Sequence, residues 1–168
     1  MFQYDRGHMC RKSTAFHIGK NADYNTHTVL NACPQRSDLN QGIWEDLEDR
    51  IESRADFYDS LWVICGPVFY SKPTAWLGEE GEVPVAIPDA FFKIIVKINQ
   101  RSSRPDVLAF IYPQTAPREK PYTSESHQKY LVTVNRIEEL TGLNFLTRLP
   151  GEIEESTESL RAASLWTH

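Results

Sequence analysis

The strongest constraint on the fold of this chain is one amphipathic segment near its start. Residues 38–55 carry apolar side chains at helical spacing, which would form a single stripe on a helix: Ile43, Trp44, Leu47 and Ile51. Asp38 at the start of this segment, with Gln41 three residues later, has the spacing of a capping box. The sequence therefore predicts a long helix here with one face packed on a core.

Most of the other ordered segments are predicted to be strands. Short apolar runs between turn residues indicate strands at 2–4, 26–30, 60–69 (interrupted at Gly66-Pro67), 83–87, 91–98, 107–112 and 130–133. Loops or turns are expected at 9–25, at 32–38 and at 114–127, and a short helix ending at Gly142 is expected at 137–140. This pattern predicts an α+β fold with a mostly antiparallel sheet.

Length and cysteine content limit the classes of protein that need to be considered. The 168 residues fit one domain with its own core, expected over residues 1–150, followed by an acidic helix or tail over 151–168. The cysteines are odd in number and lack zinc spacing, so one disulfide or three reduced thiols both remain open: Cys10, Cys33 and Cys65. No apolar run reaches the ~20 residues that span a membrane, and no membrane partner is expected.

Charge is distributed unevenly along the chain. The net charge is −5, which argues against a protein that coats nucleic acid through bulk charge, because such proteins are basic. An enzyme needs only a local positive site. The first 36 residues are locally basic, whereas residues 45–59 are strongly acidic. This basic region coincides with the motif described next.

Asp5-Arg6-Gly7-His8 has the side chains that hydrolysis of a phosphodiester requires. A base must deprotonate water, and imidazole suits this task because its pKa lies near working pH. Gly7 predicts a tight turn that lets a substrate approach His8. Arg6 would share one face of an extended segment with His8 and fits a phosphate group, while Asp5 on the other face could anchor the turn.

Two residues of the predicted helix could serve a metal ion. Asn40 in the first turn offers a neutral oxygen, which is adequate for a Mg²⁺ ion that keeps most of its waters. Glu48, two turns later, could accept hydrogen bonds from those waters. Each residue alone has an ordinary explanation, as a turn histidine, a helix cap or a solvated carboxylate, so only their combination indicates a site.

The combination resembles the signature of the DNA/RNA non-specific endonucleases, a branch of the ββα-metal nucleases. Asp5-Arg6-Gly7-His8 matches the DRGH motif of that family. Two further blocks match N-x-x-P-Q and N-Q-G-x-W, namely residues 31–35 and 40–44. Weaker similarity continues along nearly the whole chain.

This resemblance implies roles for single residues. His8 would be the general base, Asn40 the side-chain ligand of the metal, and Glu48 the acidic partner of the metal-bound waters. Arg6 matches the arginine beside the base, and Asn31 matches a strand residue whose surroundings help to fix the histidine. The implied cofactor is Mg²⁺, with Mn²⁺ as a substitute. The implied substrates are DNA and RNA, cut to leave 5′-phosphate ends. The basic residues around the motif are the candidate substrate contacts: Arg11, Lys12 and Arg36.

The start of the chain departs from the family pattern. Relatives usually carry further strands before DRGH, whereas four residues precede Asp5 here, so we expect either an N-terminally truncated fragment or a pared-down domain. An exposed edge at residues 2–4 would then invite pairing with a second chain, giving a homodimer. Phe92 and Ile94 would be partly uncovered if they faced that side.

Two other functions remain open from the sequence. One is a catalytically impaired module of the same fold that binds nucleic acid or another protein. The other is a zinc hydrolase using His8, His17 and His27, although these histidines lack a short ligand spacing. The presence of His8, Asn40 and Glu48 together favours catalysis, since a binding module need not keep all three.

Overall fold

A four-stranded antiparallel sheet forms the centre of the molecule. The computed structural model describes residues 3–58, 60–98 and 104–166. The strand order in the sheet is β3-β6-β7-β8, and every neighbouring pair is antiparallel. The bounds of these strands are Leu61–Val68 (β3), Ala90–Lys97 (β6), Asp106–Pro113 (β7) and Leu131–Val132 (β8). The predicted α+β class with a mostly antiparallel sheet is confirmed.

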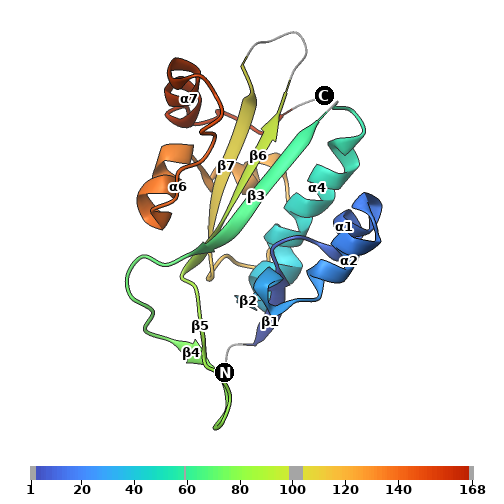
Figure 1. Ribbon diagram of the computed structural model, residues 1–168, viewed down its shortest axis with the longest axis vertical. Coiled ribbons are helices and arrows are strands. Elements are labelled where there is room, and N and C mark those ends of the chain that lie inside the picture. Colours follow the sequence, from blue (N-terminus) through green and yellow to red (C-terminus); the bar gives the residue numbers. More distant parts are fainter. Residues whose placement is uncertain (1–2, 59, 99–103, 167–168) are drawn as a thin grey trace.

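Helices cover both faces of this sheet (Figure 1). On one face, Phe91 and Ile95 pack in a buried cluster with Leu47 of α4 (Glu45–Ala55). On the other face, Phe92 and Ile94 pack with Ile137 of α6 (Val134–Thr141), beside which lies α7 (Gly151–Glu158). The expectation that Phe92 and Ile94 would be partly uncovered is wrong, because α6 covers them and leaves 3% and 0% of them exposed.

The N-terminal part is a two-stranded ribbon that leads into the long helix. β1 (Tyr4–His8) pairs antiparallel with β2 (Ala32–Arg36), with His8 opposite Ala32. Helices α1 (Lys12–Ile18) and α2 (Lys20–Thr26) and a 3₁₀ turn, η1 (Val29–Asn31), connect the two strands. β2 continues into α3 (Ser37–Leu39), the π-type turn η2 (Asn40–Trp44) and α4. Two strands and a helix therefore lie in the order that the resemblance implies.

Several local predictions in this region are wrong. Residues 9–25 form two helices instead of a long loop, and residues 26–30 form the end of α2 and part of η1 instead of a strand. Residues 32–36 form a strand instead of a turn. Pro34 is tolerated there because β2 has only one partner, so the missing N–H need not break a ladder.

The predicted helix at 38–55 exists, but its start differs from the prediction. The helix begins at Ser37. Neither Arg36, which precedes α3, nor Leu39, which precedes η2, makes a side-chain cap hydrogen bond, so the capping box predicted at Asp38 is wrong. Within η2, Gly42 has non-helical angles of φ −115° and ψ −121°. A Cβ at Gly42 would lie 2.7 Å from the hydroxyl oxygen of Tyr122, so any other residue here would force Tyr122 to shift.

The remaining elements are short. β3 continues through Gly66-Pro67 without the predicted interruption, because β3 is an edge strand of its sheet. A hairpin of β4 (Trp76–Leu77) and β5 (Val85–Ala86) projects from the body, and α5 (Ser124–Gln128) lies inside the predicted loop. α6 ends before Gly142, as predicted.

The C-terminal segment and the cysteines complete the description. Leu165, beyond α7, is buried in the same cluster as Leu47, while the domain boundary at residue 150 stays a prediction. The three cysteines are free thiols. Among the described residues, no helix has the length and apolar character needed to cross a membrane.

Candidate active site

Strand β1 presents the side chains of Asp5-Arg6-Gly7-His8 on two faces. Arg6 and His8 are exposed, whereas Asp5 is half-buried and Gly7 is buried, as the alternation of a strand requires. The tight turn predicted at Gly7 is wrong, because Gly7 lies inside the strand. A Cβ at Gly7 would lie 2.5 Å from the Cβ of Gln35 and closer still to its amide oxygen. Glycine is therefore needed here so that the fully buried Gln35 can pack under β1.

The carboxylate of Asp5 joins β1 to the start of the long helix. Its Oδ1 accepts a hydrogen bond from the hydroxyl of Ser37 at 2.8 Å. Its Oδ2 accepts from the amide nitrogens of Asn40 at 2.9 Å and Gln41 at 2.8 Å. Burial acts to raise the pKa of Asp5, but the hydrogen bonds from Asn40, Ser37 and Gln41 outweigh it and lower the pKa. Asp5 is therefore a carboxylate at neutral pH.

This contact fixes the orientation of the Asn40 side chain. A carboxylate can only accept hydrogen bonds, so the amide nitrogen of Asn40 must face Asp5 and its oxygen must face away. Within the described part of the chain, no hydrogen bond uses that oxygen. A neutral oxygen that is held in place and unused is a suitable ligand for a hard, hydrated cation.

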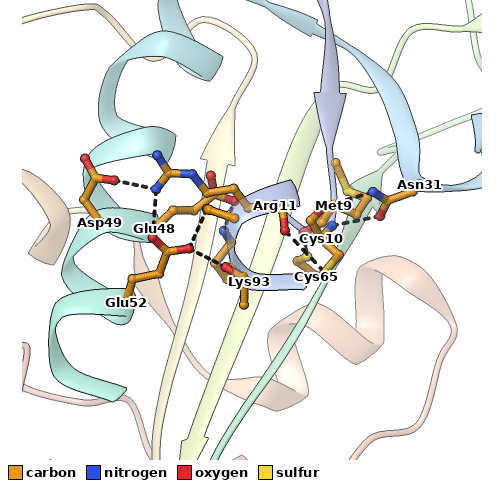
Figure 2. A network of polar contacts seen from close by, with 11 residues as sticks. Met9, Cys10, Arg11, Asn31, Glu48, Asp49, Glu52, Cys65 and Lys93 are labelled. Atoms are coloured by element: carbon orange, nitrogen blue, oxygen red, sulfur yellow. Dashed lines mark hydrogen bonds and ion pairs between the residues drawn. The ribbon is translucent and has the colours of Figure 1, made fainter. Parts of the chain in front are cut away.

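Asn31 fixes the chain directly after His8 (Figure 2). Its side-chain oxygen accepts from the backbone N–H of Cys10 at 2.8 Å, and its nitrogen donates to the backbone oxygen of Cys10 at 2.9 Å. The backbone N–H of Met9 also donates to the backbone oxygen of Asn31 at 2.8 Å. Because Met9 follows His8 directly, these three bonds restrict where the His8 backbone can lie.

A cleft of about 340 Å³ opens beside this segment. Met9, Cys10 and Asn31 line it on one side, and Glu48 and Lys93 line it on another. Nζ of Lys93 lies 2.9 Å from Oε1 of Glu48, and both side chains are largely buried. Glu48 is therefore held at the cleft by a charged partner, close to the segment that follows His8.

A buried polar network fixes α4, which carries Glu48, to the sheet. The hydroxyl oxygen of Tyr112 on β7 lies 2.9 Å from Nδ1 of His127, and Nε2 of His127 lies 2.8 Å from Oδ2 of Asp46 on α4. Arg50 pairs with Asp46 one helical turn away and donates to the backbone oxygen of Tyr122 at 2.9 Å. Burial lowers the pKa of His127, although the hydrogen bond to Asp46 acts against this shift. The ring is therefore neutral at pH 7, accepting from Tyr112 and donating to Asp46.

Comparison with known proteins identifies the family. Residues 2–152 match the family described as DNA/RNA non-specific endonuclease. The chain belongs to this family. It is 30% identical over 164 residues to a protein named Nuclease from Serratia marcescens, covering 92% of this chain and 55% of that protein.

Two mitochondrial nucleases give a similar result. Nuclease 1, mitochondrial, of Schizosaccharomyces pombe is 30% identical over 158 residues, covering 88% of this chain and 47% of that protein. Endonuclease G, mitochondrial, of Homo sapiens is 27% identical over 152 residues, covering 87% and 49%. The chain thus spans about half the length of the relatives it matches.

Of the residues implied by the family motif, Asn31 and Glu48 line the cleft, whereas His8, Arg6 and Asn40 are not in its lining. Asn40 is instead bonded to Asp5 of the DRGH strand, and His8 and Arg6 share the exposed face of that strand. These contacts connect the three sequence blocks that carry the resemblance to the family.

The candidate substrate contacts lie in different surroundings. Arg11 pairs with Asp49 and, at 3.5 Å, with Glu52, so carboxylates of α4 already engage it. Lys12 is exposed at the first turn of α1. Arg36 lies opposite Tyr4, at the other end of the ribbon from His8, and is 3.7 Å from Asp38. The substrate contacts of all three residues stay predictions, with Lys12 the most accessible.

Sequence reasoning missed two residues of this site. Lys93 is a single charge inside the apolar run 90–96, and this break in the pattern was a usable signal. Cys65 of β3 donates from its thiol to the backbone oxygen of Met9 at 2.9 Å. Burial raises the pKa of Cys65 to about 11, so the thiol keeps the proton that it donates. No sequence pattern indicated that contact, because it joins segments far apart in the chain.

Proposed function

We propose that this chain is a divalent-metal-dependent endonuclease that hydrolyses DNA and RNA without sequence preference. Membership of the DNA/RNA non-specific endonuclease family supports phosphodiester hydrolysis. The observation that carries the metal assignment is the amide of Asn40, whose nitrogen bonds Asp5 and whose oxygen is left unused. The described residues contain no group of three His, Cys, Asp or Glu side chains able to hold a metal, and a hydrated ion on one amide oxygen requires none.

The residues divide the chemistry of hydrolysis between them. His8, exposed on β1, accepts a proton from the attacking water. Arg6, on the same face, donates hydrogen bonds to the phosphate. Asn40 would hold Mg²⁺, or Mn²⁺ in its place, and Glu48 would accept from metal-bound water. When bound, the ion would supply positive charge that stabilises the phosphorane and the leaving oxygen. The products would carry 5′-phosphate ends.

A cleavage assay tests this proposal. Supercoiled plasmid and an RNA transcript are incubated with the chain and Mg²⁺, Mn²⁺ or excess EDTA. We expect nicking, linearisation and RNA degradation with either metal, and none with EDTA. A mobility-shift assay on the same substrates covers the alternative of a binding module. Retarded nucleic acid that stays intact with metal would contradict catalysis and support that alternative.

A further inference from the structure

A single lysine lies in the middle of a buried strand whose neighbouring positions along the chain are all apolar. Lys93 is 1% exposed, and the rest of β6 from Ala90 to Val96 is apolar and buried. Taking an ammonium group out of water is unfavourable unless a charged partner compensates for it. A buried ion pair is often no more stable than apolar side chains of the same volume. Stability of the fold therefore does not account for a lysine at this position.

The side chain of Lys93 points at α4. It shares a face of β6 with Phe91 and Ile95, which pack in the cluster that contains Trp44. Its Nζ lies 3.9 Å from the centre of the Trp44 ring and 2.9 Å from Oε1 of Glu48. The ring face attracts the cation and limits its movement, so the ammonium has one well-defined place.

Glu48, the partner of Lys93, lies at the edge between the core and the cleft. Glu48 keeps 14% of its side chain exposed, and it lines the cleft with Cys10 and Asn31. Lys93 engages Oε1, while Oε2 makes no hydrogen bond within the described residues. Lys93 therefore engages one carboxylate oxygen of Glu48 (Figure 2) and leaves the other without a hydrogen bond among the described residues.

We propose that Lys93 is a positioning residue that fixes Glu48 in the rotamer needed at the cleft. This inference rests on the proposed function, because Glu48 is assigned there to metal-bound water. Lys93 would act without a contact of its own to substrate or metal. Its effect is predicted to pass through Glu48 alone, which distinguishes it from a residue that only maintains the core.

The same strand provides a matched control. Lys97 lies on the same face of β6, pairs with Asp106 at 3.4 Å, and has its Nζ 4.8 Å from the Tyr58 ring and 4.4 Å from the Trp166 ring. It thus has an ion pair and aromatic contacts like those of Lys93, but it does not line the cleft. Lys93→Met and Lys97→Met make the same chemical change at the two positions.

The experiment measures kcat and KM on an oligonucleotide and Mn²⁺ affinity by calorimetry for both variants. Lys93→Met should lower kcat and Mn²⁺ affinity about 10- to 100-fold, as loss of an outer-shell partner does, with KM for nucleic acid within about twofold of wild type. Lys93→Arg should keep most of kcat because it keeps the charge. Lys97→Met should change kcat and Mn²⁺ affinity by less than about twofold.

Glu48→Gln, alone and combined with Lys93→Met, separates positioning from packing. If Lys93 acts through Glu48, the double variant should be no slower than Glu48→Gln alone. The double variant also removes both charges, so it stays informative if Lys93→Met fails to fold. Additive losses, or equal losses in Lys93→Met and Lys97→Met, would overturn the inference. A wild-type chain that binds Mn²⁺ but cleaves nothing would overturn the proposed function, while the Mn²⁺ affinities would still test Lys93.

Discussion

His8 can be tested with little risk to the fold, because its side chain is exposed on β1. His8→Ala should lower kcat/KM by about 10²–10⁴, the usual cost of losing a general base. The melting temperature should hardly change, since exposed substitutions alter stability by only about 0.5 kcal/mol. Plasmid cleavage and thermal melts measure the two effects. His17→Ala, at an exposed histidine of α1, is the control, and full turnover in His8→Ala would remove His8 from the mechanism.

Asn40 has a neighbour that allows a matched comparison. Asn40→Ala removes the unused amide oxygen and one donor to Asp5, whereas Gln41→Ala removes a donor to the same Asp5 oxygen without touching Asn40. Asn40→Ala should weaken Mn²⁺ binding at least about 10-fold, because a direct ligand is lost. Gln41→Ala should weaken it much less. Calorimetric titration gives both affinities, and equal losses would mean that the state of Asp5 matters instead of a ligand at Asn40.

At the scale of elements, the sequence predicted those with a clear apolar pattern. The segment 38–55 buries apolar positions at helical spacing, and the strands at 91–98 and 107–112 bury near-continuous apolar runs, so both patterns were visible. Helices α1 and α2 bury only Ala15 and Thr26 respectively, and they expose Phe16, Ile18 and Tyr24. Their apolar side chains form no stripe toward a core, so no period could reveal them.

Two further features depend on tertiary packing and could not be predicted from local sequence rules: the prolines inside strands and the contact between Lys93 and Glu48. Pro34 and Pro67 both lie inside strands, because each strand has a side without a partner. The family motif predicted that His8, Asn40 and Glu48 belong to one site. It could not reveal the contact of Lys93 with Glu48, which depends on how β6 packs against α4 across 45 positions of sequence.

The β1-β2 ribbon depends on the absence of a side chain at Gly7. A Cβ there would meet the Cβ of Gln35 at 2.5 Å, and that atom is too close to the backbone to move freely. Gly7→Ala should therefore push the two strands apart and destabilise the protein by about 1–3 kcal/mol. Urea denaturation measures this loss. Gly151→Ala is the control, because a Cβ at Gly151 meets nothing within 4 Å, and equal stability of the two variants would contradict the packing argument.

At the scale of the whole molecule, two buried groups give opposite dependences of stability on pH. Burial lowers the pKa of His127, so its contribution is complete above the unfolded value of about 6.5 and declines as pH falls below it. Burial, followed by repulsion from Glu138, Glu154 and Glu155, raises the pKa of Glu158 to about 7. The contribution of Glu158 is complete below its unfolded pKa near 4.5 and is lost as pH rises through about 7.

Because these two effects overlap between pH 4.5 and 6.5, only a difference between variants can isolate either one. Glu158 is 5% exposed, and its Oε1 has no hydrogen-bond partner among the described residues, so its ionised form is poorly compensated. Glu158→Gln should therefore match wild type near pH 4.5 and exceed its stability by about 1–3 kcal/mol at pH 8. Urea denaturation across this range measures the difference. Glu152→Gln, on an exposed turn of the same helix, should show no such trend. A difference that stays flat for Glu158→Gln would mean that its carboxylate reaches water or a cation in the folded protein.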